Sequence, residues 1–353
     1  MSKHSSGRSS ETSAESSESV LPPHLQVMQT AGSLVTARAL YALAELGVAD
    51  YLEDGPRSVE ELARKTGAHA PSLYRLLRTM AAYGFFVEGE RRSFSLTPLG
   101  AALRSGAPSS ARSTVLTTAG QTYWQAFSEF LHSVRTGEPG AEKVLGKSFF
   151  EHLSEAPEEA HLFNEAMAGI YGGEPPAIAE AYDFSGIERI VDVGGGGGSL
   201  LTTILLANPQ MRGVLYDRSH VVQESRTLVE AEGLGERCDA VEGDFLESVP
   251  AGGDAYLLSH VLHDWAEPEC LTILSNCRRA MDGRGRLLVV EMVVPPGAEP
   301  HPAKHIDLVM LAVTGGRERD EEEYAELLGK ADFELRQVVP TALPSSVIEA
   351  RPA

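Results

Sequence analysis

The sequence predicts an α/β protein in which a mainly parallel sheet fills the second half of the chain and a separate helical domain precedes it. Three observations predict this class. From Ile187 onward, short apolar segments alternate with helical segments. The segment 287–290 is apolar without interruption, which is typical of strands buried on both faces of a parallel sheet. The chain has 353 residues, enough for two domains with separate cores.

The N-terminal part divides into a tail and a small domain. Residues 1–20 are rich in serine and contain no apolar run, so we expect a disordered tail there. In residues 21–105, an apolar helical pattern over 31–46 ends at Gly47. The segments that follow have the pattern of a winged helix.

Two further helices and a hairpin complete this winged-helix pattern. Ser58 and Glu61 form a capping box for a short helix, and a second amphipathic helix is expected over 71–81. Strands at 85–88 and 93–96 flank a turn. Such modules bind DNA in many regulators, but between Arg57 and Arg104 eight basic and four acidic residues leave only a weak local charge of 8 − 4 = +4. We therefore favour dimerisation as the role of this domain.

Residues 106–182 read as a helical linker that carries scattered aromatic residues, among them Trp124. Most of these rings are expected in a core, and some are expected to line an apolar substrate pocket between the domains. The domain over 183–353 then begins with five expected strands, at 189–193, 213–216, 239–241, 255–261 and 286–294. Two consecutive strands at 333–339 and 345–350 are expected to close the sheet as a hairpin.

A glycine run follows the first of these strands. Glycine lets the backbone approach a ligand closely, and the carboxyl end of a central strand is the usual ligand crevice of such a sheet. The run does not match the dinucleotide pattern GxGxxG, because Ser199 stands at its third position. Asp192, Gly194 and Gly196 instead fit the acidic-x-G-x-G-x-G pattern of S-adenosylmethionine-binding folds.

Acidic residues end the next two strands and strengthen this interpretation. Asp217 stands where a carboxylate can accept hydrogen bonds from both ribose hydroxyls of a nucleoside. In the segment that begins at Glu242, Gly243 precedes Asp244, which can accept from an adenine amino group, and Phe245, which can pack on the ring. Alone, each aspartate is more often a turn or cap residue. Together, three such strand ends predict a cofactor site.

His263 follows the fourth strand and faces the same crevice if side chains alternate along that strand. A neutral imidazole can remove a phenolic proton near neutral pH. Glu291, within the fifth strand, and Glu318 are both candidates to orient the imidazole. For metal binding, His301 and His305 lie four residues apart, but no third ligand is in view, so we predict no metal site.

The overall composition limits the classes of partner that this chain is expected to bind. The net charge of −20 disfavours nucleic acid and anionic membranes, and no apolar run is long enough to cross a bilayer. Three cysteines without a CxxC spacing indicate the reducing cytoplasm.

The residues quoted above resemble a known family, the small-molecule O-methyltransferases that include plant caffeic acid and flavonoid enzymes and bacterial antibiotic-tailoring enzymes. The resemblance covers residues 25–351. It rests on the segments 191–196, 243–245, 261–265, 290–291 and 315–319.

The resemblance implies a Rossmann-like class I methyltransferase domain joined to a winged-helix dimerisation domain, with a small aromatic hydroxylated substrate between them. It implies a homodimer, S-adenosylmethionine as cofactor, and His263 as the base between Glu291 and Glu318. Implied cofactor contacts are Gly194, Asp217, Asp244, Phe245 and Ser259, and implied substrate or methyl-donor contacts are Phe163, Met167 and Met310.

The sequence also departs from the plant members of this family. Ser259 replaces their lysine, Arg218 follows Asp217 where Leu-Pro is frequent, and the loop 312–316 is one residue shorter. The acceptor is therefore expected among polyketides, quinones or similar scaffolds rather than lignin precursors. Two alternatives stay open: a relative that binds S-adenosylmethionine but catalyses hydroxylation or a pericyclic step, and a winged-helix DNA-binding regulator.

Overall fold

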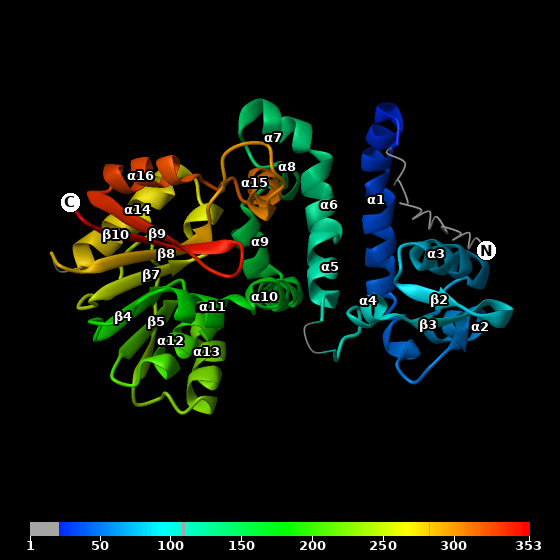
Figure 1. Ribbon diagram of the computed structural model, residues 1–353, viewed down its shortest axis with the longest axis horizontal. Coiled ribbons are helices and arrows are strands. Elements are labelled where there is room, and N and C mark those ends of the chain that lie inside the picture. The colour runs from blue at the N-terminus through cyan, green and yellow to red at the C-terminus, as the bar shows by residue number, and fades with distance from the viewer. Residues whose placement is uncertain (1–20, 108–109, 282) are drawn as a thin grey trace, which may run out of the picture.

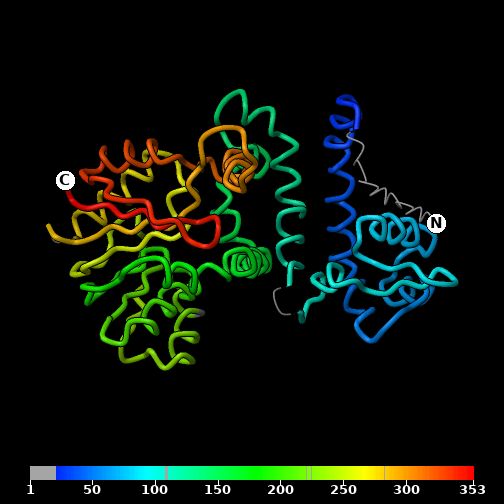
Figure 2. Tube along the Cα trace, in the orientation of Figure 1, coloured from blue at the N-terminus to red at the C-terminus, as the bar shows by residue number. Residues whose placement is uncertain are grey.

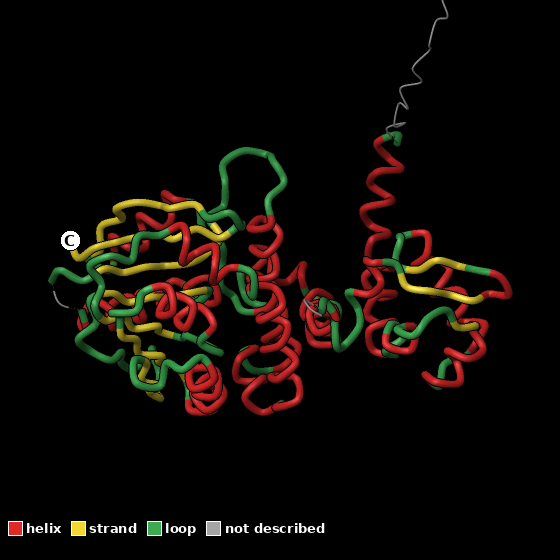
Figure 3. The backbone as a smooth tube through the Cα atoms, turned by 60° about the horizontal axis from the view of Figure 1, so that its bottom comes forward, coloured by secondary structure: helices red, strands yellow, loops and turns green. Residues whose placement is uncertain are grey.

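The computed structural model describes residues 21–107, 110–281 and 283–353, so the prediction of a tail at residues 1–20 lies outside the described residues. The expected class is confirmed. A seven-stranded mixed sheet fills the C-terminal domain, and a smaller domain precedes it (Figure 1). Figure 3 shows the strands of the large sheet gathered at one end of the molecule and helices between the two domains.

The large sheet has the strand order β6-β5-β4-β7-β8-β10-β9. Its first five strands are parallel, and β10 pairs antiparallel with β8 and with β9. The strands are β4 (Arg189–Val193), β5 (Arg212–Asp217), β6 (Cys238–Glu242), β7 (Ala255–Ser259), β8 (Arg286–Met292), β9 (Phe333–Pro340) and β10 (Ser345–Pro352). The carboxyl ends of β4, β5, β6 and β7 therefore meet at one edge.

Helices cover both faces of this sheet because its central strands are apolar on both sides. One buried cluster includes Ile273, Tyr324 and Leu287, and the opposite cluster includes Ile178, Leu201 and Leu288. The helices that belong to this domain are α11 (Glu174–Ala181), α12 (Ser199–Ala207), α13 (Ser219–Ala231), α14 (Glu267–Ala280), α15 (Pro302–Val313) and α16 (Glu321–Lys330).

The N-terminal domain has a separate core that includes Leu62, Leu77 and Phe94. The capping box of Ser58 and Glu61 is present. The first helix is longer than expected because it starts at Pro23, where proline suits a helix start. The elements are α1 (Pro23–Glu45), η1 (Asp50–Leu52), β1 (Arg57–Ser58), α2 (Val59–Thr66), α3 (Ala70–Ala82), β2 (Phe86–Glu88), η2 (Glu90–Arg92), β3 (Ser93–Leu96) and α4 (Pro98–Ala101).

A helical region joins the two domains and carries a fourth apolar cluster, which includes Tyr123, Phe149 and Val313. Its helices are α5 (Arg112–Thr118), α6 (Gln121–Ser128), α7 (Phe130–Thr136), α8 (Gly140–Leu145), α9 (Phe149–Glu155) and α10 (Pro157–Tyr171). Figure 2 shows this region between the sheet domain and α1. Because Val313 belongs to α15, the cluster ties the helical region to the sheet domain.

Two strand ends were predicted too far along the chain. The fourth strand stops at Ser259 instead of residue 261, because His260 adopts a left-handed conformation (φ 52°) and the chain then turns into the short helix η3 (Leu262–Asp264). The fifth strand stops at Met292 instead of residue 294. The first of these corrections matters for the site, since it places His263 on a turn above the strand end.

Candidate functional site

The glycine turn at the end of β4 leaves room for a ligand. Gly194 adopts φ +75°, and a Cβ there would lie 3.0 Å from Val261 and 3.4 Å from the ring of Phe245. A Cβ on Gly196, also left-handed, would meet nothing within 4 Å. The turn therefore presents open backbone beside Phe245, at the edge where the sequence predicts the cofactor.

Asp192 is the least satisfied polar group of this turn. Its side chain is 1% exposed, and neither carboxylate oxygen has a hydrogen-bond partner in the described part of the chain. Burial, reinforced by the nearby charge of Asp217, raises the pKa of Asp192 to about 7. An orphaned buried carboxylate fits the binding of a ligand that carries positive charge, as the sulfonium of S-adenosylmethionine does.

Asp217 and Asp244 hold the loops around this crevice. The Asp217 carboxylate accepts from the backbone N–H of Gly196 at 2.9 Å and of Arg218 at 2.6 Å. Asp244 accepts from Leu246 N–H at 2.8 Å and lies 3.4 Å from the Arg218 guanidinium. Both aspartates thus also have the turn roles that their residue type favours. Carboxylate oxygens accept several bonds each, so these contacts leave capacity for ligand hydroxyl and amino groups.

Gly243 and Ser259 have less direct connections with the crevice. A Cβ on Gly243 would lie 2.2 Å from the hydroxyl oxygen of Tyr216, so close packing against that ring already requires glycine there. Ser259 is the last residue of β7 and is half-buried. Their predicted contacts with the cofactor stay predictions.

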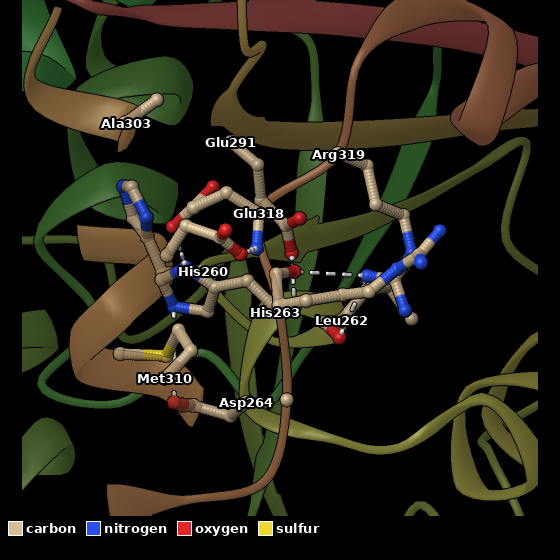
Figure 4. A network of polar contacts seen from close by, with 12 residues as sticks. His260, Leu262, His263, Asp264, Glu291, Ala303, Met310, Glu318 and Arg319 are labelled. Atoms are coloured by element: carbon tan, nitrogen blue, oxygen red, sulfur yellow. Dashed lines mark hydrogen bonds and ion pairs between the residues drawn. The ribbon is translucent and has the colours of Figure 1, made fainter. Parts of the chain in front are cut away.

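His263 is held by two carboxylates in different ways (Figure 4). Its Nδ1 lies 2.7 Å from Glu318 Oε1, and its backbone N–H donates to Glu291 Oε1 at 3.1 Å. The imidazole is therefore oriented by Glu318, whereas Glu291 fixes the backbone of η3. Since a carboxylate only accepts, Nδ1 carries the proton, and the Nε2 atom is left as the basic nitrogen.

The charge around His263 strengthens its affinity for a proton. Burial alone would lower its pKa, but the carboxylates of Asp264, Glu318 and Glu291 outweigh burial and raise the pKa of His263 to about 10. Asp264 Oδ1 is 3.9 Å from Nε2, and burial raises the pKa of Asp264 to about 6. The site is thus arranged to stabilise an imidazolium.

Neighbouring groups keep this arrangement rigid. Tyr324 donates its hydroxyl hydrogen to Glu291, and the buried Arg319 donates to the carbonyl oxygen of Leu262 at 3.3 Å. A Cβ on Gly316 would lie 1.9 Å from the carbonyl oxygen of His263, so only glycine allows the loop that carries Glu318 to approach η3 this closely. Close packing against η3 therefore requires glycine at position 316.

Aromatic side chains form a wall from the cofactor crevice toward the helical region. The ring centroids of Phe245 and Trp265 lie 5.9 Å apart, and Trp265 stacks on Phe150 with the same centroid separation of 5.9 Å. The ring centroids of Phe163 and Phe150 lie 6.4 Å apart, and the predicted substrate contact of Phe163 stays a prediction. Figure 4 shows Met310 in the same part of the site as His263 and Asp264, and its side chain is 8% exposed.

The predicted contact of Trp124 with the substrate stays a prediction. Trp124 is 39% exposed, and the Arg38 guanidinium of α1 lies 4.9 Å from its ring, so within one chain it faces the N-terminal helix. Its neighbour Tyr123 is buried instead, and burial and the charge of Asp264 raise the pKa of its hydroxyl. Adjacent helix positions point in different directions, and Tyr123 is the one of the two close enough to Asp264 to feel its charge. Met167, on α10, is partly buried.

Several residues near His263 were missed by sequence reasoning. His260 lies next to it, with ring centroids 5.4 Å apart. Tyr171 stacks on His260 at 3.8 Å, and Glu174 Oε2 lies 2.7 Å from His260 Nε2. A second histidine in the segment around His263 was the available signal, but nothing in the sequence links it to α10 or α11.

Comparisons with known proteins identify the family of this chain. A family model described as an O-methyltransferase domain matches residues 127–334, and one described as an O-methyltransferase dimerisation domain matches residues 28–106. Phenazine O-methyltransferase PhzM of Lysobacter antibioticus is 46% identical over 315 residues, which cover 89% of this chain and 92% of that protein.

A solved structure and a second relative show the range of these similarities. The crystal structure of NcsB1, an O-methyltransferase from neocarzinostatin biosynthesis in complex with S-adenosylmethionine and 2-hydroxy-5-methyl naphthoic acid, has a TM-score of 0.82 and 33% identity, covering 90% of this chain and 96% of that one. Aclacinomycin 10-hydroxylase RdmB of Streptomyces purpurascens is 35% identical, covering 88% of this chain and 84% of that protein.

Proposed function

This chain belongs to the S-adenosylmethionine-dependent O-methyltransferases, and we propose that it methylates a phenolic or enolic hydroxyl of a small aromatic natural product with His263 as general base. The observation that carries the proposal is the short contact between His263 Nδ1 and Glu318, which leaves Nε2 as a basic nitrogen beside the cofactor crevice. Bound S-adenosylmethionine supplies an electrophilic methyl group there. The residues that would hold this cofactor are Asp192, Gly194, Gly196, Asp217, Asp244 and Phe245. Gly243 and Ser259 would lie alongside it.

In the proposed reaction, Nε2 of His263 takes the proton of the acceptor hydroxyl. Bound S-adenosylmethionine would supply the methyl group to the acceptor oxygen, its S–CH₃ bond breaking so that S-adenosylhomocysteine is the leaving group. Glu318 stabilises the imidazolium that forms, and Glu291 keeps η3 in place. The rings of Phe150, Phe163 and Trp265 would hold the acceptor ring, with Met167 and Met310 nearby. The helical region of α5 to α10 would cover the acceptor. Such positioning can contribute about 7–11 kcal/mol to catalysis.

Product analysis tests the reaction class, because it distinguishes methyl transfer from the hydroxylating or pericyclic alternative. The similarity to the hydroxylase RdmB is the reason to test this alternative. With a methyl-labelled donor, a phenolic acceptor should gain one labelled CH₂ unit. A product that gains one oxygen atom, or an unlabelled isomer of the acceptor, would contradict methyl transfer.

Asp192 offers a test of the cofactor crevice. In the folded protein the pKa of Asp192 is about 7, whereas its usual value is 3.8. The folded state therefore binds the proton more tightly than the unfolded state, and folding stability falls as the pH rises from 3.8 to about 7. We expect Asp192→Asn to raise the melting temperature of the cofactor-free protein at pH 8 by roughly 3 °C or more. The same change removes a charge that favours a cationic ligand, so the affinity for S-adenosylmethionine should fall at least about fivefold by calorimetry.

Asp239 provides the matched control for this experiment. It lies on β6, and Asp239→Asn should change neither quantity. If Asp192→Asn left affinity for S-adenosylmethionine unchanged, Asp192 would not belong to the cofactor site.

A homodimer is proposed from the family match and from the exposed side of α1. Val27, Met28, Leu34 and Val35 repeat at seven-residue spacing and are 52–69% exposed. Leu131 and Val134 of α7 are also exposed. A second copy of this chain would cover both apolar surfaces.

Charge on this stripe should weaken the dimer. We expect Val35→Glu to convert the protein to monomers at micromolar concentration in analytical ultracentrifugation, because the charge would be desolvated at the interface. Leu206→Glu, at an exposed apolar position on α12, should leave the assembly unchanged. A Val35→Glu protein that still dimerises would rule out α1 as the interface.

Within the described residues no helix is long and apolar enough to cross a membrane. The described chain also contains three cysteines, all buried and free. Free thiols suit the reducing cytoplasm, where we propose that the enzyme works without nucleic-acid or membrane partners.

A further inference from the structure

A second carboxylate–imidazole pair lies beside the one that orients His263. In the first pair, Glu318 contacts His263 Nδ1 at 2.7 Å. In the second pair, Glu174 contacts His260 Nε2, also at 2.7 Å. The two imidazole rings are 5.4 Å apart between centroids, and Figure 4 shows His260 beside His263.

The second pair is rigidly built from four separate segments of the chain. His260 adopts the left-handed backbone conformation at the end of β7, and the Tyr171 ring of α10 stacks on it at 3.8 Å with an interplanar angle of 25°. Ser345, at the start of β10, donates to Glu174 Oε1 at 2.5 Å. The side chains of His260 and Glu174 are 12% and 8% exposed. Nothing in the reaction proposed above uses this arrangement.

Two polar atoms of this arrangement have no hydrogen-bond partner among the described residues. Because Glu174 only accepts, Nε2 of His260 carries the proton, and Nδ1 is a hydrogen-bond acceptor. Nδ1 is buried and has no hydrogen bond within the described residues. The Tyr171 hydroxyl also forms none there. Burial, with the charges of Asp264, Glu318 and Glu174, raises the pKa of Tyr171, so this hydroxyl is a donor at neutral pH.

We propose that His260 and Tyr171 bind a second polar group of the acceptor, a hydroxyl or amino group on the ring carbon next to the hydroxyl that His263 deprotonates. A hydroxyl group complements the pair, because it can donate to His260 Nδ1 and accept from Tyr171. The charge of Asp264 and Glu318 nearby disfavours a carboxylate in this place. Glu174 is then a positioning residue that sets the tautomer of His260. The inference rests on the proposed function and names its substrate class.

The test uses two probe acceptors that differ by one adjacent hydroxyl, 2,3-dihydroxynaphthalene and 2-naphthol. We expect wild-type protein to prefer the diol at least about tenfold in kcat/KM, because a site built to bind a hydroxyl rejects an analogue that lacks it. Tyr171→Phe keeps the stacked ring and His260→Asn tolerates the left-handed backbone. Each should reduce the preference to less than about threefold while 2-naphthol turnover changes little.

Binding and a matched control complete the design. Calorimetry on the protein saturated with S-adenosylhomocysteine should show the same loss of diol preference in Kd, and unchanged affinity for S-adenosylhomocysteine shows that each variant is folded. His161→Asn removes a histidine that lies 3.6 Å from Glu165 on the same helix as Tyr171, and it should leave the preference intact.

The outcomes separate this inference from the function on which it rests. Equal use of both probes by wild-type protein, or a preference that survives both substitutions, would overturn the inference while methyl transfer stands. Failure of both probes to bind and to accept a methyl group would contradict the phenolic acceptor itself, and the inference with it.

Discussion

Replacement of His263 by alanine is expected to lower kcat for methyl transfer by about 10²–10⁴-fold, the usual contribution of general base catalysis. The reason is that Nε2 is the basic nitrogen of an imidazole that Glu318 already holds in place. The rate of the chemical step, measured by rapid quench with a labelled methyl donor, checks this expectation.

Binding measurements distinguish loss of the base from loss of the fold. Calorimetry should find S-adenosylmethionine bound to His263→Ala with an affinity within about threefold of wild type, since the crevice at Gly194 and Asp217 is untouched. His152→Ala is a suitable control, because His152 pairs with Glu159 at 2.9 Å outside the catalytic group. An unchanged chemical rate in His263→Ala would remove it from the role of base.

The second large effect is expected at Glu318. Glu318→Gln should lower kcat on the order of 100-fold, because an amide can turn its N–H toward Nδ1 and favour the wrong tautomer of His263. The substitution also removes one of the carboxylates that raise the pKa of His263 to about 10. The base must be unprotonated to act, so the rate rises with pH, and the midpoint of this rise should move down by roughly 1–3 pH units.

The pH profile of kcat/KM checks the sign of this shift. Ionisation of the acceptor contributes equally to both profiles, so the difference between the proteins reports the enzyme. Glu291→Gln should shift the profile in the same direction and cost less activity, because Glu291 contacts the backbone N–H of His263 and not the ring. A midpoint that moves upward in Glu318→Gln would contradict the electrostatic account of the site.

Much of the fold can be predicted from local patterns in the sequence. The strand at Arg189–Val193 was predicted with its observed bounds, because a mainly apolar run ends at a glycine turn that begins with the left-handed Gly194. Capping by Ser58 and Glu61 also depends only on neighbouring residues. Asp192, Asp217 and Asp244 come to one edge of the sheet because parallel strands bring their carboxyl ends together.

What the sequence could not predict depends on contacts between distant segments. Glu174 and Ser345 lie 171 positions apart, and no periodicity links them. The left-handed conformation of His260 lies within a segment whose sequence pattern predicts a strand. Trp124 and Tyr123 are neighbours on one helix, and only its packing decides which ring faces Asp264. The choice between Glu291 and Glu318 likewise needed the position of the ring.

The central claim is that His263 removes the proton of the acceptor hydroxyl. A crystal structure of the protein with S-adenosylhomocysteine and a methylatable hydroxyarene measures this most directly. We expect the acceptor oxygen within about 2.6–3.2 Å of His263 Nε2, with Nδ1 still bound to Glu318. An acceptor oxygen that lies beyond hydrogen-bond reach of Nε2, with another side chain bound to it, would exclude His263 as the base.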